Sequence, residues 1–74
     1  MSPDKIIRMA NQIAVFFTTK PEAEGVVGIA EHINAYWEPR MRTQLYALLD
    51  AGAPDFHPLF LAAASGIRRP AEAA

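Results

Sequence analysis

Residues 32–45 read HINAYWEPRMRTQL and hold the only Trp of a 74-residue chain, a proline and two arginines one residue apart. Proline fixes its own φ and disfavours helix at the residue before it, yet it suits the first position of a helix. Pro39 therefore predicts that one helix ends near Trp37 and that the next begins at Pro39. The rest of the fold follows from what lies on either side of this break.

Apolar side chains recur at helical spacing on both sides of the break, and no segment alternates with period two. Ser2 and Pro3 suit the cap and first position of the first helix, and Thr19 and Glu22 have capping-box spacing for the second. The four expected helices cover residues 3–18, 21–36, 39–51 and 58–65. The sequence therefore predicts an all-α fold, a small bundle of three to four short helices with no strands.

The second helix carries two glycines, Gly25 and Gly28, each costing about 1 kcal/mol of helix stability relative to Ala. Either this helix starts late, or another helix approaches it closely at these positions. Towards the other end, Gly52 is a natural glycine for ending the third helix. Residues 1–67 are expected to form one domain, and residues 68–74, RRPAEAA, a mobile C-terminal tail.

Composition argues against several kinds of site and partner. Without cysteine the chain cannot supply a disulfide, a thiolate metal site or iron–sulfur ligands, and His32 and His57 are far apart in sequence. A net charge of −1 provides no basic face for nucleic acid. No apolar run approaches the ~20 residues of a membrane span, and Met1–Lys5 lacks signal-peptide character, so we expect a cytoplasmic protein.

No arrangement of residues suggests catalysis or cofactor binding. Ser2 and Ser65 are the only serines, and neither lies in a strand–turn–helix elbow. The stretch Gly25–Gly28 lacks the preceding strand and the following Lys of a phosphate-binding loop. We therefore expect a protein that is not an enzyme, with no catalytic, cofactor-binding or metal-binding residue.

The residues around the break suggest a docking surface, because Trp, Tyr and Arg are enriched in the energetic centres of protein interfaces. The alternative is a corner between helices, with Trp37 in the core and both arginines solvated. Arg40 and Arg42 would point about 200° apart on a helix, so at least one of them should have a specific partner.

Polar residues beside the apolar stripes raise the same question, because an amide or imidazole there needs a hydrogen-bond partner. Asn11, Gln12, His32 and Asn34 are in this position. Their partners could lie within the chain or in another protein. The candidate interface residues are Arg8, Asn11, Gln12, His32, Tyr36, Trp37, Arg40 and Arg42.

Three blocks, in this order, carry a resemblance to a known family: DKIIRMANQIAVFF (4–17), GIAEHINAYWEPRMRTQLYALL (28–49) and PLFLAAASGIRRP (58–70). Together they resemble the delta subunit of cytoplasmic NAD-dependent formate dehydrogenase. The pieces WEPRMR (37–42) and IRMANQI (7–13) are the specific ones, because Ala- and Leu-rich stretches match many helical proteins.

The resemblance implies a place in an enzyme that oxidises formate and reduces NAD. Its alpha subunit carries a molybdenum or tungsten bis-pterin cofactor and iron–sulfur clusters, and its beta and gamma subunits carry FMN, further clusters and the NAD site. The resemblance implies that the delta subunit binds no cofactor and acts as a structural subunit on the alpha subunit or as a transient assembly factor. From the residues alone, a free-standing helical regulator also stays open.

Overall fold

The computed structural model describes residues 2–52 and 55–69. It confirms the prediction of a small all-α fold, since this part of the chain contains helices and no strand. The elements are α1 (Pro3–Phe17), α2 (Glu22–Tyr36), α3 (Pro39–Asp50), α4 (Pro58–Ala63) and a 3-10 turn, η1 (Ala64–Gly66). The expected boundaries are met within one or two residues.

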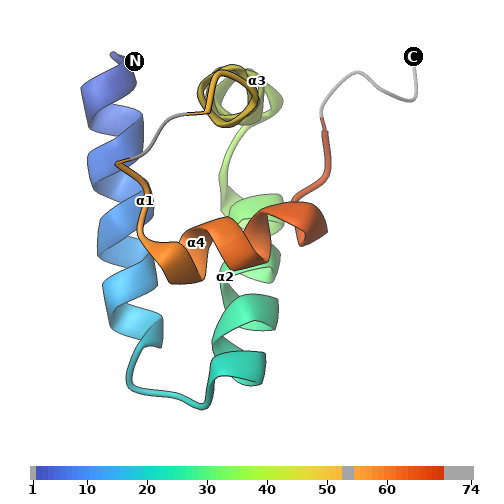
Figure 1. The fold of residues 1–74 in the computed structure, drawn as a ribbon. Helices are drawn as coiled ribbons and strands as arrows, with labels where there is room; N and C mark the ends of the chain where they lie inside the picture. Colours follow the sequence, from blue (N-terminus) through green and yellow to red (C-terminus); the bar gives the residue numbers. More distant parts are fainter. Residues whose placement is uncertain (1, 53–54, 70–74) are drawn as a thin grey trace.

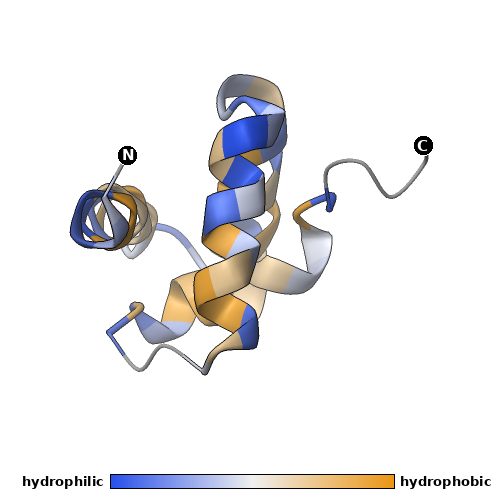
Figure 2. Cartoon of the chain, turned by 90° about the horizontal axis from the view of Figure 1, so that it is seen from above, coloured by the Kyte–Doolittle hydropathy of each residue, from blue (hydrophilic) through white to orange (hydrophobic). Residues whose placement is uncertain are grey.

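Helices α1 and α2 stand side by side and run in opposite directions, and α4 crosses in front of them (Figure 1). Helix α3 lies beside the upper half of α1 and is seen end-on in this view. Seen from above, α3 changes from hydrophilic residues in its first turns to hydrophobic residues in its last (Figure 2). Its C-terminal half, which holds the buried Leu45, is therefore the half that supplies the core.

Local signals place most helix ends where the sequence predicts them. The Ser2 side chain accepts a bond from the Lys5 amide, at 3.3 Å, and caps α1. Pro39 begins α3, and Gly52 ends it with a φ of +76°, a backbone conformation that side-chain-bearing residues rarely adopt.

The expected capping box at the start of α2 is wrong. The Thr19 hydroxyl donates to the Phe16 carbonyl, at 3.0 Å, so this side chain closes the end of α1. Helix α2 begins at Glu22, with Pro21 as its cap residue and no capping side chain. Spacing alone missed this because a threonine can bond backward to a carbonyl as easily as forward to an amide.

Gly25 and Gly28 lie inside α2 and permit close approach, so the alternative of a late helix start is wrong. A Cβ added at Gly28 would lie 2.4 Å from a ring carbon of Phe17. A Cβ at Gly25 would lie 3.2 Å from the Phe17 carbonyl oxygen and 3.3 Å from a methyl of Leu59. The glycines therefore let the end of α1 and the start of α4 settle against α2.

The core lies where the four helices meet. Its largest fully buried side chains are Ile6, Ile29, Ile33, Leu45 and Phe60. Trp37, at the end of α2, is 5% exposed, so the interpretation of this residue as part of the core is confirmed. Two large aromatic side chains stay outside this core, since Phe16 is 64% and Tyr36 is 74% exposed.

The chain after η1 is bonded to α2 and α3. Ile67 is buried, the Arg68 amide donates to the Asn34 side chain, and the Arg69 guanidinium binds the Asp50 carboxylate at 2.9 and 3.1 Å. The first two residues of the expected tail thus have defined contacts. Residues 70–74 of that tail lie outside the described residues, and its mobility stays a prediction.

Candidate docking surface

A groove of about 430 Å³ opens between α1 and α2. Five of its residues come from α1 at the spacing of one helical face, and the other two come from the second half of α2 and its end. Its lining is Met9, Gln12, Ile13, Phe16, Phe17, His32 and Trp37. No residue of α3 or α4 is among them, so the two helices that complete the core leave this side of the α1–α2 pair uncovered.

Two exposed aromatic rings border this groove. Phe16 stands nearly perpendicular to Phe17, with ring centres 5.1 Å apart. At the other end the ring of Tyr36 packs on His32, with centres 4.9 Å apart. Large exposed aromatic residues beside an apolar groove are typical of protein–protein contact sites.

Three polar side chains in the groove have no hydrogen-bond partner among the described residues. They are the Gln12 amide, the His32 imidazole and the Trp37 indole, and all three are among the predicted interface residues. None of their polar atoms is fully buried without a partner, so each remains open to solvent or to a ligand. The groove thus combines an apolar lining with a few free polar groups.

Asn11 and Asn34 have their partners within the chain. The Asn11 amide donates to the Asp55 carbonyl at 2.9 Å and accepts from the His57 amide at 2.8 Å, bridging the backbone on both sides of Phe56. The Asn34 amide does the same around Ile67, donating to Gly66 and accepting from Arg68, at 2.9 and 2.8 Å.

Each asparagine therefore pairs with a short stretch of backbone as a neighbouring β-strand would. Phe56 and Ile67, the residues between the bonded groups, are 3% and 2% exposed. The two amides hold the beginning and the end of the α4–η1 segment, so that these two side chains stay in the core.

Arg42 also bonds within the chain. Its guanidinium donates to the carbonyls of Trp37, at 3.3 Å, and Arg68, at 3.1 Å. At least one of the two arginines was expected to have a specific partner, and for Arg42 that partner is the chain's own backbone. Arg40 is exposed and makes no ion pair or hydrogen bond with the described residues.

The predicted interface residues thus fall into three groups, and Gln12 belongs to two of them. Gln12, His32 and Trp37 line the groove, and Tyr36 borders it. A shallow hollow of about 370 Å³ along α1 is lined by Arg8, Asn11, Gln12 and Val15. Arg40 and Arg42 lie on the first turn of α3, apart from the groove.

Sequence reasoning missed the apolar part of the groove, namely Met9, Ile13, Phe16 and Phe17. The signal was present, because the apolar stripe of the first helix is wider than one neighbouring helix covers. A stripe this wide is equally typical of a helix that is buried on more than one side, so the pattern alone does not distinguish an open groove from a core contact.

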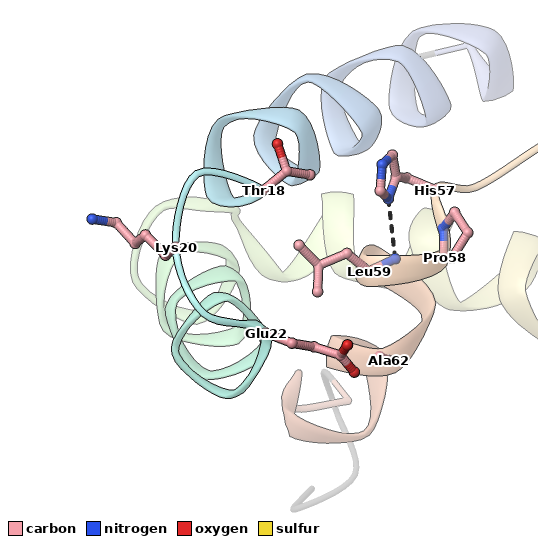
Figure 3. Close-up of a pocket in the computed structure, with 7 residues that line it drawn as sticks. All are labelled: Thr18, Lys20, Glu22, His57, Pro58, Leu59 and Ala62. Carbon is pink, nitrogen blue, oxygen red and sulfur yellow. Dashed lines mark hydrogen bonds between the residues drawn. The ribbon is translucent and has the colours of Figure 1, made fainter.

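A second hollow, of about 340 Å³, lies between the end of α1 and the start of α4 (Figure 3). Lys20 points away from this hollow. The Nδ1 atom of His57 accepts a hydrogen bond from the Leu59 amide, with the two nitrogens 3.0 Å apart, and so caps α4. Among the described residues, no group of three or more His, Cys, Asp or Glu side chains could hold a metal ion. No helix in that part of the chain is long and apolar enough to cross a membrane.

The fold and the groove together define a class of small helical proteins in which one face of a helix pair is left uncovered. Comparison with protein-family models gives the particular family. The chain belongs to the family described as the NADH-dependent formate dehydrogenase delta subunit, FdsD, whose model matches residues 5–64. The resemblance seen in the sequence is therefore confirmed. No curated protein matches the chain.

Proposed function

We propose that this chain is a non-catalytic subunit that docks through the α1–α2 groove onto the large catalytic (alpha) subunit of formate dehydrogenase and stabilises it. Family membership supports the complex. The observation that carries the docking site is the pair of exposed aromatic rings, Phe16 and Tyr36, beside a groove whose polar groups lack partners. Covering them would remove apolar surface from water, at roughly 25 cal/mol per Å².

In this proposal the cofactors stay on the partner subunits. The alpha subunit would hold the molybdenum or tungsten bis-pterin and iron–sulfur clusters, and the beta and gamma subunits FMN, further clusters and the NAD site. This chain has no cysteine and so supplies no thiolate ligand to a cluster. Its contribution would be binding energy within a cytoplasmic assembly, with no contact to nucleic acid or membrane.

The same groove would serve a transient assembly factor that binds the immature large subunit and then leaves. Purification of the tagged chain from its host, followed by native mass spectrometry and metal analysis, distinguishes the two roles. A stoichiometric complex with metal and formate-to-NAD activity supports the permanent subunit. A metal-free large subunit supports the assembly factor, and recovery of the chain alone contradicts both.

The docking surface is tested by measuring affinity of purified variants for the enzyme prepared without this chain. Phe16→Ala and Tyr36→Ala should each weaken binding about tenfold or more, because each removes an exposed anchor. Leu61→Ala is the matched control, since Leu61 is 45% exposed on α4 and does not line the groove. An equal loss in the control, or no loss in the two aromatic variants, would refute this surface.

The arginines at the start of α3 call for different tests. Arg40→Ala should weaken docking without changing the stability of the isolated chain, because Arg40 is exposed and has no partner among the described residues. Arg42→Ala should lower that stability, because Arg42 holds the carbonyls of Trp37 and Arg68. Arg40 is therefore the variant that tests the interface, and unchanged binding would remove this corner from it.

A further inference from the structure

We infer that the groove receives one amphipathic helix of the large subunit, with acidic residues on the flank facing α1 and basic residues on the flank facing α2. This inference rests on the proposed function and names the form and chemistry of the partner segment. It follows from the polarity of the groove lining, the length of the groove and the charges on its two sides.

The polarity of the lining favours a helix over an extended segment. The groove walls are two α-helices whose backbone groups are bonded within each helix, so they present no edge to pair with a strand. Its polar side chains are limited to Gln12, His32 and Trp37. An extended segment would bury backbone amides and carbonyls without partners, whereas a helix satisfies its own.

The length of the groove fits a short helix. Its α1 wall runs from Met9 to Phe17, about 12 Å at 1.5 Å per residue. A partner helix of roughly three turns would cover this length, with apolar anchors at positions i, i+3 or i+4, and i+7. The free indole N–H of Trp37 would require a hydrogen-bond acceptor on that helix.

The two flanks of the groove carry opposite charge. On the α1 side, the hollow that contains Arg8 adjoins the groove through Gln12, which lines both. On the α2 side, a hollow that contains Glu24 and Glu31 adjoins it through Phe17. Lys20, in the turn between the two helices, also lines this α2-side hollow and adds a positive charge there. Glu31 lies next to His32 in sequence, so it is the acidic residue we assign to this flank of the groove.

These flanking charges are available to a partner. Among the described residues, Arg8, Glu24 and Glu31 form no ion pair or hydrogen bond. Opposite charges on two sides of an apolar groove favour one orientation of an amphipathic helix and disfavour the reverse. A helix with acidic residues near Arg8 and basic residues near Glu31 would place opposite charges against both flanks of the groove.

Photo-crosslinking in the intact complex tests the form of the partner. A photoreactive phenylalanine analogue replaces Phe16, and the crosslinked peptide is identified by mass spectrometry. We expect a crosslink to a segment of the large subunit that is helical and has apolar residues at i, i+3 or i+4, and i+7. Crosslinking to an extended segment, to another subunit or to a second copy of this chain would overturn the inference.

Charge reversal tests the flanks in the same complex. Arg8→Glu and Glu31→Lys should each weaken binding about threefold to tenfold at low salt, and the difference from the unchanged protein should shrink as salt screens the charges. Arg68→Glu and Glu22→Lys are the matched controls, because they change net charge equally at exposed positions that do not line the groove or the two adjoining hollows.

The outcomes separate this inference from the proposed function. If Phe16→Ala and Tyr36→Ala weaken binding while both reversals match their controls, docking in the groove stands and the charged helix is overturned. If none of the four variants weakens binding, both proposals fall. Weaker binding in all four, with unchanged controls, supports both.

Discussion

At the scale of single residues, three amides of similar chemistry have two different roles. Asn11 and Asn34 each bond both a carbonyl and an amide of a distant backbone stretch, whereas Gln12 has no partner among the described residues. A bonded amide contributes to stability, and its removal leaves backbone groups to be solvated again. An unpaired amide beside a groove contributes nothing to the isolated fold.

This contrast predicts the stability of three variants. Asn11→Ala and Asn34→Ala should each lower the free energy of unfolding by about 1–2 kcal/mol, because each loses two hydrogen bonds. Gln12→Ala should stay within about 0.5 kcal/mol of the unchanged protein. Urea unfolding followed by circular dichroism measures all three. Equal effects at the three positions would show that the amide bridges carry no stability.

At the scale of elements, the contact between α1 and α2 depends on a missing side chain. The ring of Phe17 occupies the space where a Cβ at Gly28 would lie. Glycine costs α2 about 1 kcal/mol of helix stability relative to Ala, so this packing must offset that cost. Phe17 also lines the groove, and the same contact therefore helps to shape the groove.

A double-mutant cycle tests this contact. Gly28→Ala should lower stability by about 1–2 kcal/mol despite the gain in helix propensity, because the Phe17 ring must move. In a Phe17→Ala background the same change should raise stability by up to about 1 kcal/mol, since the clash is absent. Thermal or urea unfolding gives the four values. The same sign in both backgrounds would mean that close approach is not the reason for this glycine.

The segment after η1 is held to α3 by an ion pair with a predictable pH dependence. The hydrogen bond from Arg69 to Asp50, supported by its charge, lowers the pKa of the Asp50 carboxyl below its ordinary value of 3.8. Asp50 is the last residue of α3, where the helix dipole disfavours a carboxylate, and Arg69 supplies the compensating positive charge. The Arg69 guanidinium also lies over the Tyr46 ring, at 4.1 Å.

Because the folded pKa is the lower one, the pair stabilises the folded state above pH 3.8, and this contribution is lost as pH falls through the lowered pKa. The stability difference between the unchanged protein and Asp50→Asn should therefore be constant near neutral pH and shrink in acid. Urea midpoints across the pH range measure it. An Arg69→Gln background is the control, and a pH dependence that persists there would assign the effect to another group.

In the molecule as a whole, one aromatic residue takes part in the core, in the end of a helix and in the groove. Trp37 is buried where α2 ends, its carbonyl binds Arg42, and its ring lines the groove. Domains of this size bury only about 60% of their unfolded surface, so their total stability is modest. Trp37 therefore belongs both to the core and to the proposed docking surface.

Trp37→Ala should lower the free energy of unfolding by about 3–5 kcal/mol, which is comparable to the whole stability of such a domain. We expect loss of helical signal at 37 °C and, as a result, loss of docking. Tyr36→Ala, one residue away and exposed, is the control that should lose docking while keeping its fold. A folded Trp37→Ala protein of unchanged stability would contradict the role of this residue in the core.

The limits of the helices could be predicted from the sequence to within one or two residues, because proline, a capping serine and apolar spacing act within one or two turns of the chain. Pro3, Pro39 and Gly52 lie at the helix ends where local chemistry requires them. The sequence also indicated the family, but it left open whether Trp37 belongs to the core or to a docking surface.

Tertiary packing sets which polar side chains bond within the fold and which have no partner among the described residues. Asn11 and Gln12 are neighbours in sequence and similar in chemistry, yet one bonds the backbone near residue 56 and the other faces the groove. That difference depends on where α4 crosses the α1–α2 pair. Local patterns do not encode this crossing, because it results from the simultaneous packing of side chains from all four helices.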